Sequence, residues 1–253
     1  MLAVNDAPGA VSGAARGRWI WTVSGVLTAA ALTALAARLA VSAGSPAAPV
    51  APAAVRTYAV AQPVTSVDIT SAGDPVRVTA ADVNRVEVTI AFHGKAGNPP
   101  GPGTVTGGRL VLSDSGCGDG GWCADAFTLA VPRGTSVDVS TGGGPATVTG
   151  LAGSLRADTD GGPLSALSLG SADVSVATGG GPALIGFRTA PRMVAVTSTG
   201  GPARILVPGG PYALNADSGG GPENARIATD PSAGRTLLIS TGGGPLRVGP
   251  SGE

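Results

Sequence analysis

Residues 131–151 read VPRGTSVDVSTGGGPATVTGL and carry the clearest structural signal in the chain. Small apolar side chains alternate with polar ones on both sides of a glycine-proline corner, at Val137 and Val139 before it and at Ala146 and Val148 after it. Because successive side chains of a strand point to opposite faces, this alternation predicts two short strands. Glycine supplies the positive φ that a tight corner needs, and proline fixes φ where the chain leaves it.

The same unit recurs six times, with corner prolines 18 to 23 residues apart. Its corners are Gly143, Gly144, Pro145; Gly161, Gly162, Pro163; Gly180, Gly181, Pro182; Gly200, Gly201, Pro202; Gly220, Gly221, Pro222; and Gly243, Gly244, Pro245. The positions six and eight before each proline are apolar, as are those one and three after it, with the single exception of Glu223. Such self-similarity is typical of repeat architectures.

One unit cannot bury its apolar positions alone, but stacked units about 4.8 Å apart would bury them as continuous columns. The repeat therefore predicts an all-β fold, specifically a β-solenoid (β-helix-like) of about six units of 18–23 residues. An antiparallel sandwich of hairpins is the alternative, since short strands at regular spacing suit it too. The near-constant unit length favours the solenoid.

A hydroxyl side chain stands four positions before every corner proline, at Thr141, Thr159, Thr178, Ser198, Ser218 and Thr241. The structural interpretation is that these hydroxyls bond the backbone of the tight corner. The functional interpretation is an exposed binding ladder for a glycan, a partner protein or ice. The sequence favours the structural role.

The stretch Val131, Pro132, Gly134, Val137, Val139 and Thr141, followed by repeats of strand, hydroxyl, glycine corner and strand, resembles the bacterial "putative adhesin" β-strand-repeat family of unknown function. The resemblance covers roughly residues 64–250 and implies a β-helix-like fold at the cell envelope. It brings no catalytic residues. Gly-Gly-Pro stands here where Ser-Gly-Asp commonly follows the family's threonine.

The N-terminal region contains an uncharged stretch from Trp19 to Ala37. Nineteen helical residues rise about 28 Å, close to the roughly 30 Å hydrocarbon core. Because Arg16 and Arg18 precede it, we expect a cytoplasmic tail (1–18), a transmembrane helix (19–40), a Pro/Ala-rich linker (41–63) and an extracytoplasmic β-repeat domain (64–250). A cleaved signal peptide is the alternative. The expected location is the cell membrane, with the N-terminus cytoplasmic.

The two cysteines, Cys117 and Cys123, flank a short loop between expected strands. An exported domain permits disulfides, so the sequence predicts that these two are linked. Two thiols without a nearby histidine make a poor zinc site.

Composition and motifs argue against an enzyme. Lys+Arg and Asp+Glu are equal at 16 each, so no basic face is expected for nucleic acid. A Ser-His-Asp triad would have to use the one histidine, His93, but the sequence contains no G-x-S-x-G nucleophile elbow with a candidate serine. Asp114, Asp119 and Asp125 fit solvated turns better than a glycosidase pair, with weak Ca²⁺ binding as the alternative. We expect no catalytic residues, no cofactor and no metal site.

Two functions remain. The leading hypothesis is a non-enzymatic, membrane-anchored surface protein that presents a rigid β-repeat domain to an envelope glycan or protein. The alternative is a sensor or regulatory membrane protein with a docking peptide in its short cytoplasmic tail.

Overall fold

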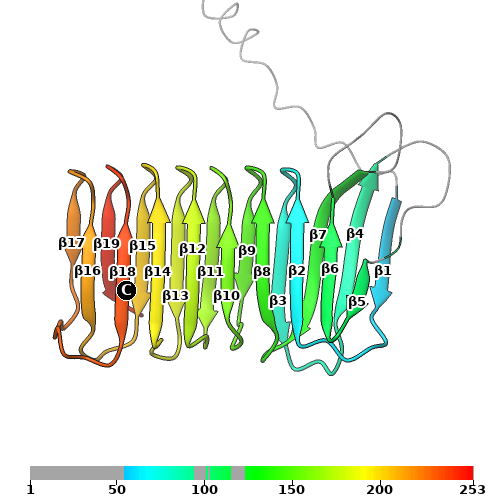
Figure 1. Ribbon diagram of the computed structural model, residues 1–253, viewed down its shortest axis with the longest axis horizontal. Coiled ribbons are helices and arrows are strands. Elements are labelled where there is room, and N and C mark those ends of the chain that lie inside the picture. Colours follow the sequence, from blue (N-terminus) through cyan, green and yellow to red (C-terminus); the bar gives the residue numbers. More distant parts are fainter. Residues whose placement is uncertain (1–53, 94–100, 102, 115–122, 253) are drawn as a thin grey trace, which may run out of the picture. The chain divides into compact units, whose positions relative to one another are not determined.

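The structure, a computed structural model, describes residues 54–93, 101, 103–114 and 123–252. All regular secondary structure in these residues is β-strand, arranged as two sheets that face each other (Figure 1). We call the ten-stranded sheet sheet A and the nine-stranded sheet sheet B.

Sheet A has the order β1 (Ala54–Ala59), β4 (Glu87–His93), β7 (Cys123–Pro132), β3 (Val76–Ala81), β9 (Ala146–Thr149), β11 (Leu164–Leu169), β13 (Ala183–Phe187), β15 (Ala203–Val207), β19 (Leu246–Pro250) and β17 (Glu223–Ala225). Sheet B has the order β16 (Ala213–Asp217), β18 (Thr236–Ser240), β14 (Met193–Ser198), β12 (Asp173–Thr178), β10 (Leu155–Asp158), β8 (Ser136–Thr141), β2 (Ser66–Ser71), β6 (Arg109–Ser113) and β5 (Thr104–Thr106).

Most neighbouring strands pair in parallel, because the chain alternates between the two sheets at each corner. The antiparallel pairs among the described strands lie at one end, where β4 pairs with β1 and β7, and β5 pairs with β6. In the parallel part the repeat columns are in register, so that Val139, Ala157, Val176, Val196 and Ile239 lie side by side in sheet B.

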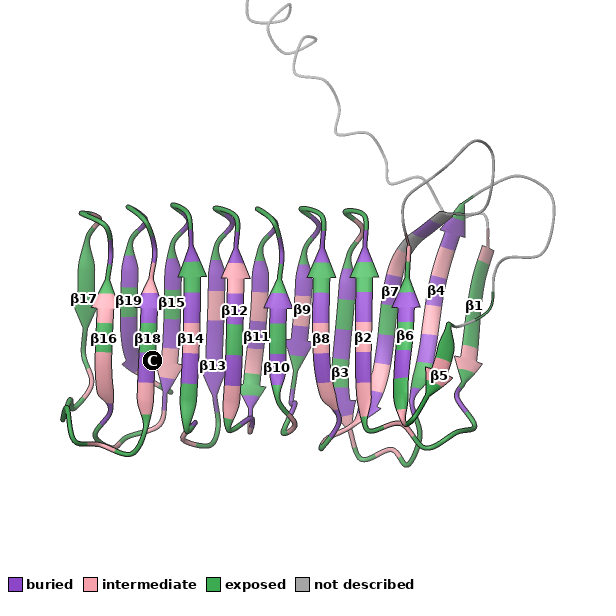
Figure 2. Ribbon diagram, viewed as in Figure 1, coloured by how far each residue is buried: buried purple, intermediate pink, exposed green. Residues whose placement is uncertain are grey.

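The core lies between the sheets and is built from small aliphatic side chains. Buried and exposed residues alternate along most strands (Figure 2). Val139, Ile185 and Ile205 are 0% exposed, which places the apolar columns of the repeat in the shared interior. Their burial is the main stabilising contribution, at about 25 cal/mol per Å² of apolar surface removed from water.

The β-solenoid predicted from the sequence is wrong. The described residues form two large mixed sheets, and the strand order departs from the chain order at both ends. At one end the sixth unit, β18 and β19, lies between the fourth unit and the fifth, β16 and β17. The fifth unit carries Glu223 at a column position and all of β17 is exposed, so it suits the open end of the stack, where a polar outer side is needed.

The predicted N-terminal transmembrane helix is not part of the observed fold. No helix in the described part of the chain is long and apolar enough to span a bilayer. The segment 19–40 for which we expected it lies outside the described residues, as do the tail and most of the linker. The first strand, Ala54–Ala59, lies within the expected linker and pairs with β4, so the sheet begins before residue 64.

The structure also contains a unit that the Gly-Gly-Pro pattern did not predict. Strands β2 and β3 flank a Gly73-Asp74-Pro75 corner and pair in register with β8 and β9. Ser71 takes the hydroxyl position and donates to the Asp74 carbonyl at 3.0 Å. The apolar columns at Val67 and Val76 were the signal that could have revealed this unit.

Candidate functional site on the outer face of sheet B

The first glycine of each corner adopts the left-handed conformation expected of it. Its φ is positive in all six units, from 93° at Gly220 to 156° at Gly200. The second glycine has a different role, since a side chain there would overlap the backbone of the neighbouring corner. A Cβ at Gly181, for example, would collide with the backbone oxygen of Gly162. At this second position the six Gly-Gly-Pro corners therefore stack too closely for a side chain.

The six hydroxyl residues are buried, between 0% and 8% exposed, so they do not form an exposed binding ladder. Four of them donate to the carbonyl of the second corner glycine, at 2.6 to 2.7 Å: Thr141, Thr159, Ser218 and Thr241. Ser198 instead accepts from the Gly201 N–H at 2.9 Å. These five hydroxyls brace the corners, as the structural interpretation expected, whereas the Thr178 hydroxyl has no hydrogen-bond partner among the described residues.

Several residues considered from the sequence cannot be placed in a site. Cys117 lies outside the described residues, and for Cys123 only the backbone is described, so their disulfide stays a prediction. Asp119 is likewise outside, and His93 is exposed at the end of β4. In the part of the chain that the structure describes, no three potential ligands lie close enough to hold a metal ion.

The outer face of sheet B carries a shallow groove of about 610 Å³ across β6, β2, β8, β10, β12 and β14. Ion pairs lie along it where neighbouring strands place opposite charges at nearby outward positions. Arg109 of β6 binds Asp68 of β2, and Arg156 of β10 lies 3.9 Å from Asp138 of β8. A further pair, Arg192 with Asp173 of β12 at 2.6 Å, continues the row.

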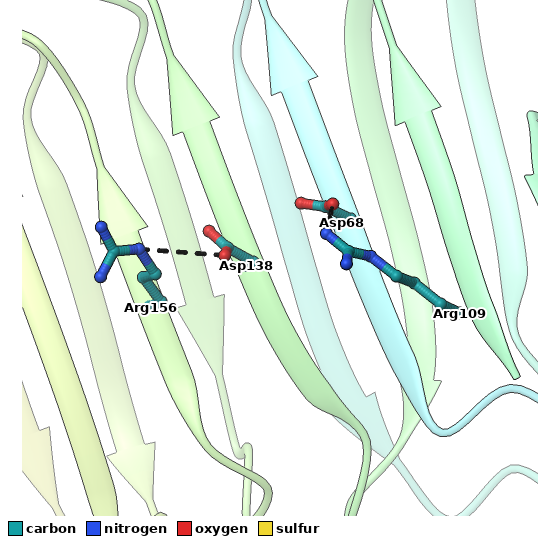
Figure 3. A network of polar contacts seen from close by, with 4 residues as sticks. All are labelled: Asp68, Arg109, Asp138 and Arg156. Atoms are coloured by element: carbon teal, nitrogen blue, oxygen red, sulfur yellow. Dashed lines mark hydrogen bonds and ion pairs between the residues drawn. The ribbon is translucent and has the colours of Figure 1, made fainter. Parts of the chain in front are cut away.

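Figure 3 shows that the two carboxylates, Asp68 and Asp138, lie on adjacent strands between their two arginines. Burial raises the pKa of the Asp138 carboxyl, the nearby Asp68 charge adds to this, and Arg156 and Arg109 oppose it. Asp68 thus accepts a hydrogen bond from Arg109, whereas Asp138 forms a longer ion pair with Arg156. The groove thus offers two adjacent carboxylates flanked by guanidinium groups, on neighbouring strands of a parallel sheet.

This arrangement can bind an extended polar molecule but is poorly suited to catalysis, because its carboxylates are already paired with guanidinium groups. The backbone ladder fixes the strands that carry these side chains, so the backbone needs little reordering when a ligand arrives.

Two solved structures are similar to this fold. One is a "putative cell adhesion protein" from Clostridium sporogenes ATCC 15579, with 10% identity, a TM-score of 0.40, and 78% of this chain and 98% of that chain covered. The other is a "putative adhesin" from Bacteroides fragilis NCTC 9343, with 13% identity, a TM-score of 0.40, and 79% and 99% covered. No family model and no curated protein matches the chain.

The charged row was not among the residues singled out from the sequence. Asp68, Asp138 and Arg156 all stand seven positions before a corner proline, an outward position between two apolar columns. Reading that position down the aligned units would have shown adjacent opposite charges. Arg109 lies outside the repeat, so its pairing with Asp68 required the strand order.

Proposed function

We propose that this chain is a non-enzymatic surface-binding protein, held at the membrane by its N-terminal part and exposing the two-sheet domain outside the cell. The single observation that supports it best is the row of ion pairs along the groove of sheet B. A flat, hydrogen-bonded sheet holds these groups at regular spacing, which suits recognition of an extended partner such as an envelope glycan or protein.

The proposal is tested by binding the purified full-length chain to isolated envelopes of the cells that make it. We expect saturable binding that Asp138→Asn/Arg156→Gln weakens roughly tenfold, since both groups would contact the partner as charges. Changing both members avoids leaving one charge unpaired. Protease treatment of the envelopes separates a protein partner from a glycan.

Thr79→Ala is the matched control, because Thr79 is exposed on the outer face of sheet A. It should bind as the unaltered chain does. Equal binding by the paired variant and the control would rule out the groove of sheet B as the binding face.

The proposed location has its own test. A reporter fused to the C-terminus should be active outside the membrane, and the chain should remain in the membrane fraction at full mass. Recovery of a soluble product that begins near Gly44 would instead mean cleavage of a signal peptide.

The predicted disulfide is tested on the same membrane material. Peptide mapping without reductant should recover Cys117 linked to Cys123, and freely alkylated thiols would exclude that disulfide.

A further inference from the structure

Three arginines gather on the outer face of sheet A, near the end of the stack formed by β15, β19 and β17. Arg204 of β15 and Arg247 of β19 are direct partners in the parallel register. Arg226 follows β17, and its backbone N–H donates to the Val248 carbonyl of β19 at 2.8 Å. All three are exposed, and together they line a hollow of about 250 Å³.

Within the described residues these three guanidinium groups have no carboxylate at ion-pair distance. Four other described arginines, Arg109, Arg133, Arg156 and Arg192, each pair with an aspartate. The remaining described arginines have no such pair either, so what distinguishes Arg204, Arg226 and Arg247 is that they lie together around one hollow. The excess of positive charge is local to this part of the surface, because the chain as a whole has a net charge of zero.

Placing Arg204 directly beside Arg247 opposes folding, since like charges at paired positions of a sheet repel each other. The other residues in the same outward row, two positions after the corner proline, include Thr147, Ser165 and Leu184, so nothing in the repeat requires arginine there. A bound anion would offset this repulsion, and the hollow between the side chains gives it room.

We propose that Arg204, Arg226 and Arg247 form a binding site for a phosphate ester. A guanidinium group presents a planar fork of donors that matches phosphate oxygens, and several forks around one tetrahedral dianion give more hydrogen bonds than a planar carboxylate can accept. This site lies on the opposite sheet from the groove proposed above, so the two proposals succeed or fail separately.

The surface beside the arginines bears on the source of the phosphate. A second groove, of about 630 Å³, runs along the corner prolines of sheet A and is lined by Pro182, Leu184, Pro202 and Pro245 together with Arg204 and Arg247. Its lining is largely apolar. A phosphate ester with an apolar tail could use both features, whereas a soluble phosphate ester would use the arginines alone.

The test is a calorimetric titration of the purified full-length chain with glycerol phosphate, followed by a water-soluble short-chain phosphatidic acid. We expect saturable binding of glycerol phosphate, weakened about tenfold or more by Arg204→Ala and by Arg247→Ala, because each removes charge-assisted hydrogen bonds. Arg204→Lys should give an intermediate loss, since lysine keeps the charge but not the fork. Tighter binding of the phosphatidic acid identifies a lipid headgroup as the source, and equal binding identifies a soluble ester.

Arg77→Ala is the matched control. Arg77 is exposed in the same outward row of sheet A, on β3, where it lies beside Thr147 rather than another arginine. It should leave the titration unchanged. Thermal melts of each variant without ligand show whether it is folded. Because the substituted side chains are exposed, their loss should not lower the melting temperature. Absence of saturable binding, or equal binding by the unaltered chain and Arg204→Ala/Arg247→Ala, would overturn the proposal.

Discussion

At the scale of single residues, the inward and outward positions of each strand have opposite tolerance for charge. Val176 and Val196 are 3% and 2% exposed, and their side chains lie between neighbouring strands of sheet B and the facing sheet. Ser175 and Ala195, one residue earlier, face outward. This alternation could be predicted from the sequence. The corner fixes the position of each strand, and a shift by one residue would turn its apolar side chains to solvent.

The first prediction compares these neighbours. Val176→Asp and Val196→Asp each bury an unpaired charge, at a cost of several kcal/mol against a total stability of about 5–15 kcal/mol. Ser175→Asp and Ala195→Asp should cost little. Thermal melts of the four variants decide it, and equal or reversed effects within a pair would mean that the register is wrong.

The second prediction concerns the second corner glycine. Gly181→Ala should lower stability by about 2–4 kcal/mol, because the methyl group overlaps the Gly162 carbonyl and the stacked corners must separate. Gly134→Ala is the control, since a Cβ there meets nothing within 4 Å. Chemical denaturation measures both, and a neutral Gly181→Ala would show that the corners can move apart freely.

The third prediction uses the raised pKa of Asp138. A folded-state pKa above the unfolded value means that the protonated carboxyl favours folding, and that this contribution is lost as pH rises through the folded pKa. Asp138→Asn should therefore raise the melting temperature at pH 7 and have little effect at pH 3. Asp173→Asn, which removes the partner of Arg192, should not raise it. A stabilising effect that persists at pH 3 would contradict the titration argument.

At the scale of the element, each unit consists of two strands and a corner, and in five of the six Gly-Gly-Pro units one buried hydroxyl is hydrogen-bonded to that corner. The spacing of that hydroxyl was evident from the sequence, and so was its preference for a structural role. Its burial was not, because a position at a corner can face either way until the neighbouring units are placed. The Gly73-Asp74-Pro75 unit was missed for a different reason, because its corner lacks the second glycine although its apolar columns match the repeat.

The fourth prediction tests the corner hydroxyl. Thr159 donates to the Gly162 carbonyl at 2.6 Å and is 0% exposed, so Thr159→Val should cost about 1–3 kcal/mol by leaving that buried carbonyl without its donor. Thr178 is equally buried, but its hydroxyl has no hydrogen-bond partner among the described residues. Thr178→Val should therefore be neutral or stabilising. Equal losses of stability in denaturation curves would contradict a brace specific to Thr159.

At the scale of the described domain, the order of the units could not be predicted from their columns. Every unit presents similar apolar positions to its neighbours, so the columns alone allow many orders. Glu223 was visible in the sequence as the one break in the apolar columns. It places the fifth unit at the end of the stack only because the sixth unit is apolar at every column position and can take the inner place instead. Leu237, Ile239 and Leu246 are buried inside the stack for that reason. The arginine site follows from this order too, because Arg204 and Arg247 are neighbours only when the sixth unit lies beside the fourth.

The fifth prediction addresses this order. A chain that ends at Gly234 lacks β18 and β19, which are the pairing partners of β16 and β17. Residues 208–234 should then become sensitive to protease while the preceding units stay protected. Limited proteolysis with mass spectrometry measures this, and continued protection of 208–234 would show that the fifth unit can bind the fourth directly.

The exchanged positions of the last two units also constrain how the chain can be made. During synthesis the fifth unit leaves the ribosome before the sixth. Its final pairing partners, β18 and β19, belong to the sixth unit and are not yet available at that point. The far end of the stack therefore cannot be completed during elongation, one unit after another. Completion must wait until the sixth unit has emerged. Until then the fifth unit must stay unpaired, or pair temporarily with the fourth unit and dissociate from it when the sixth unit binds there.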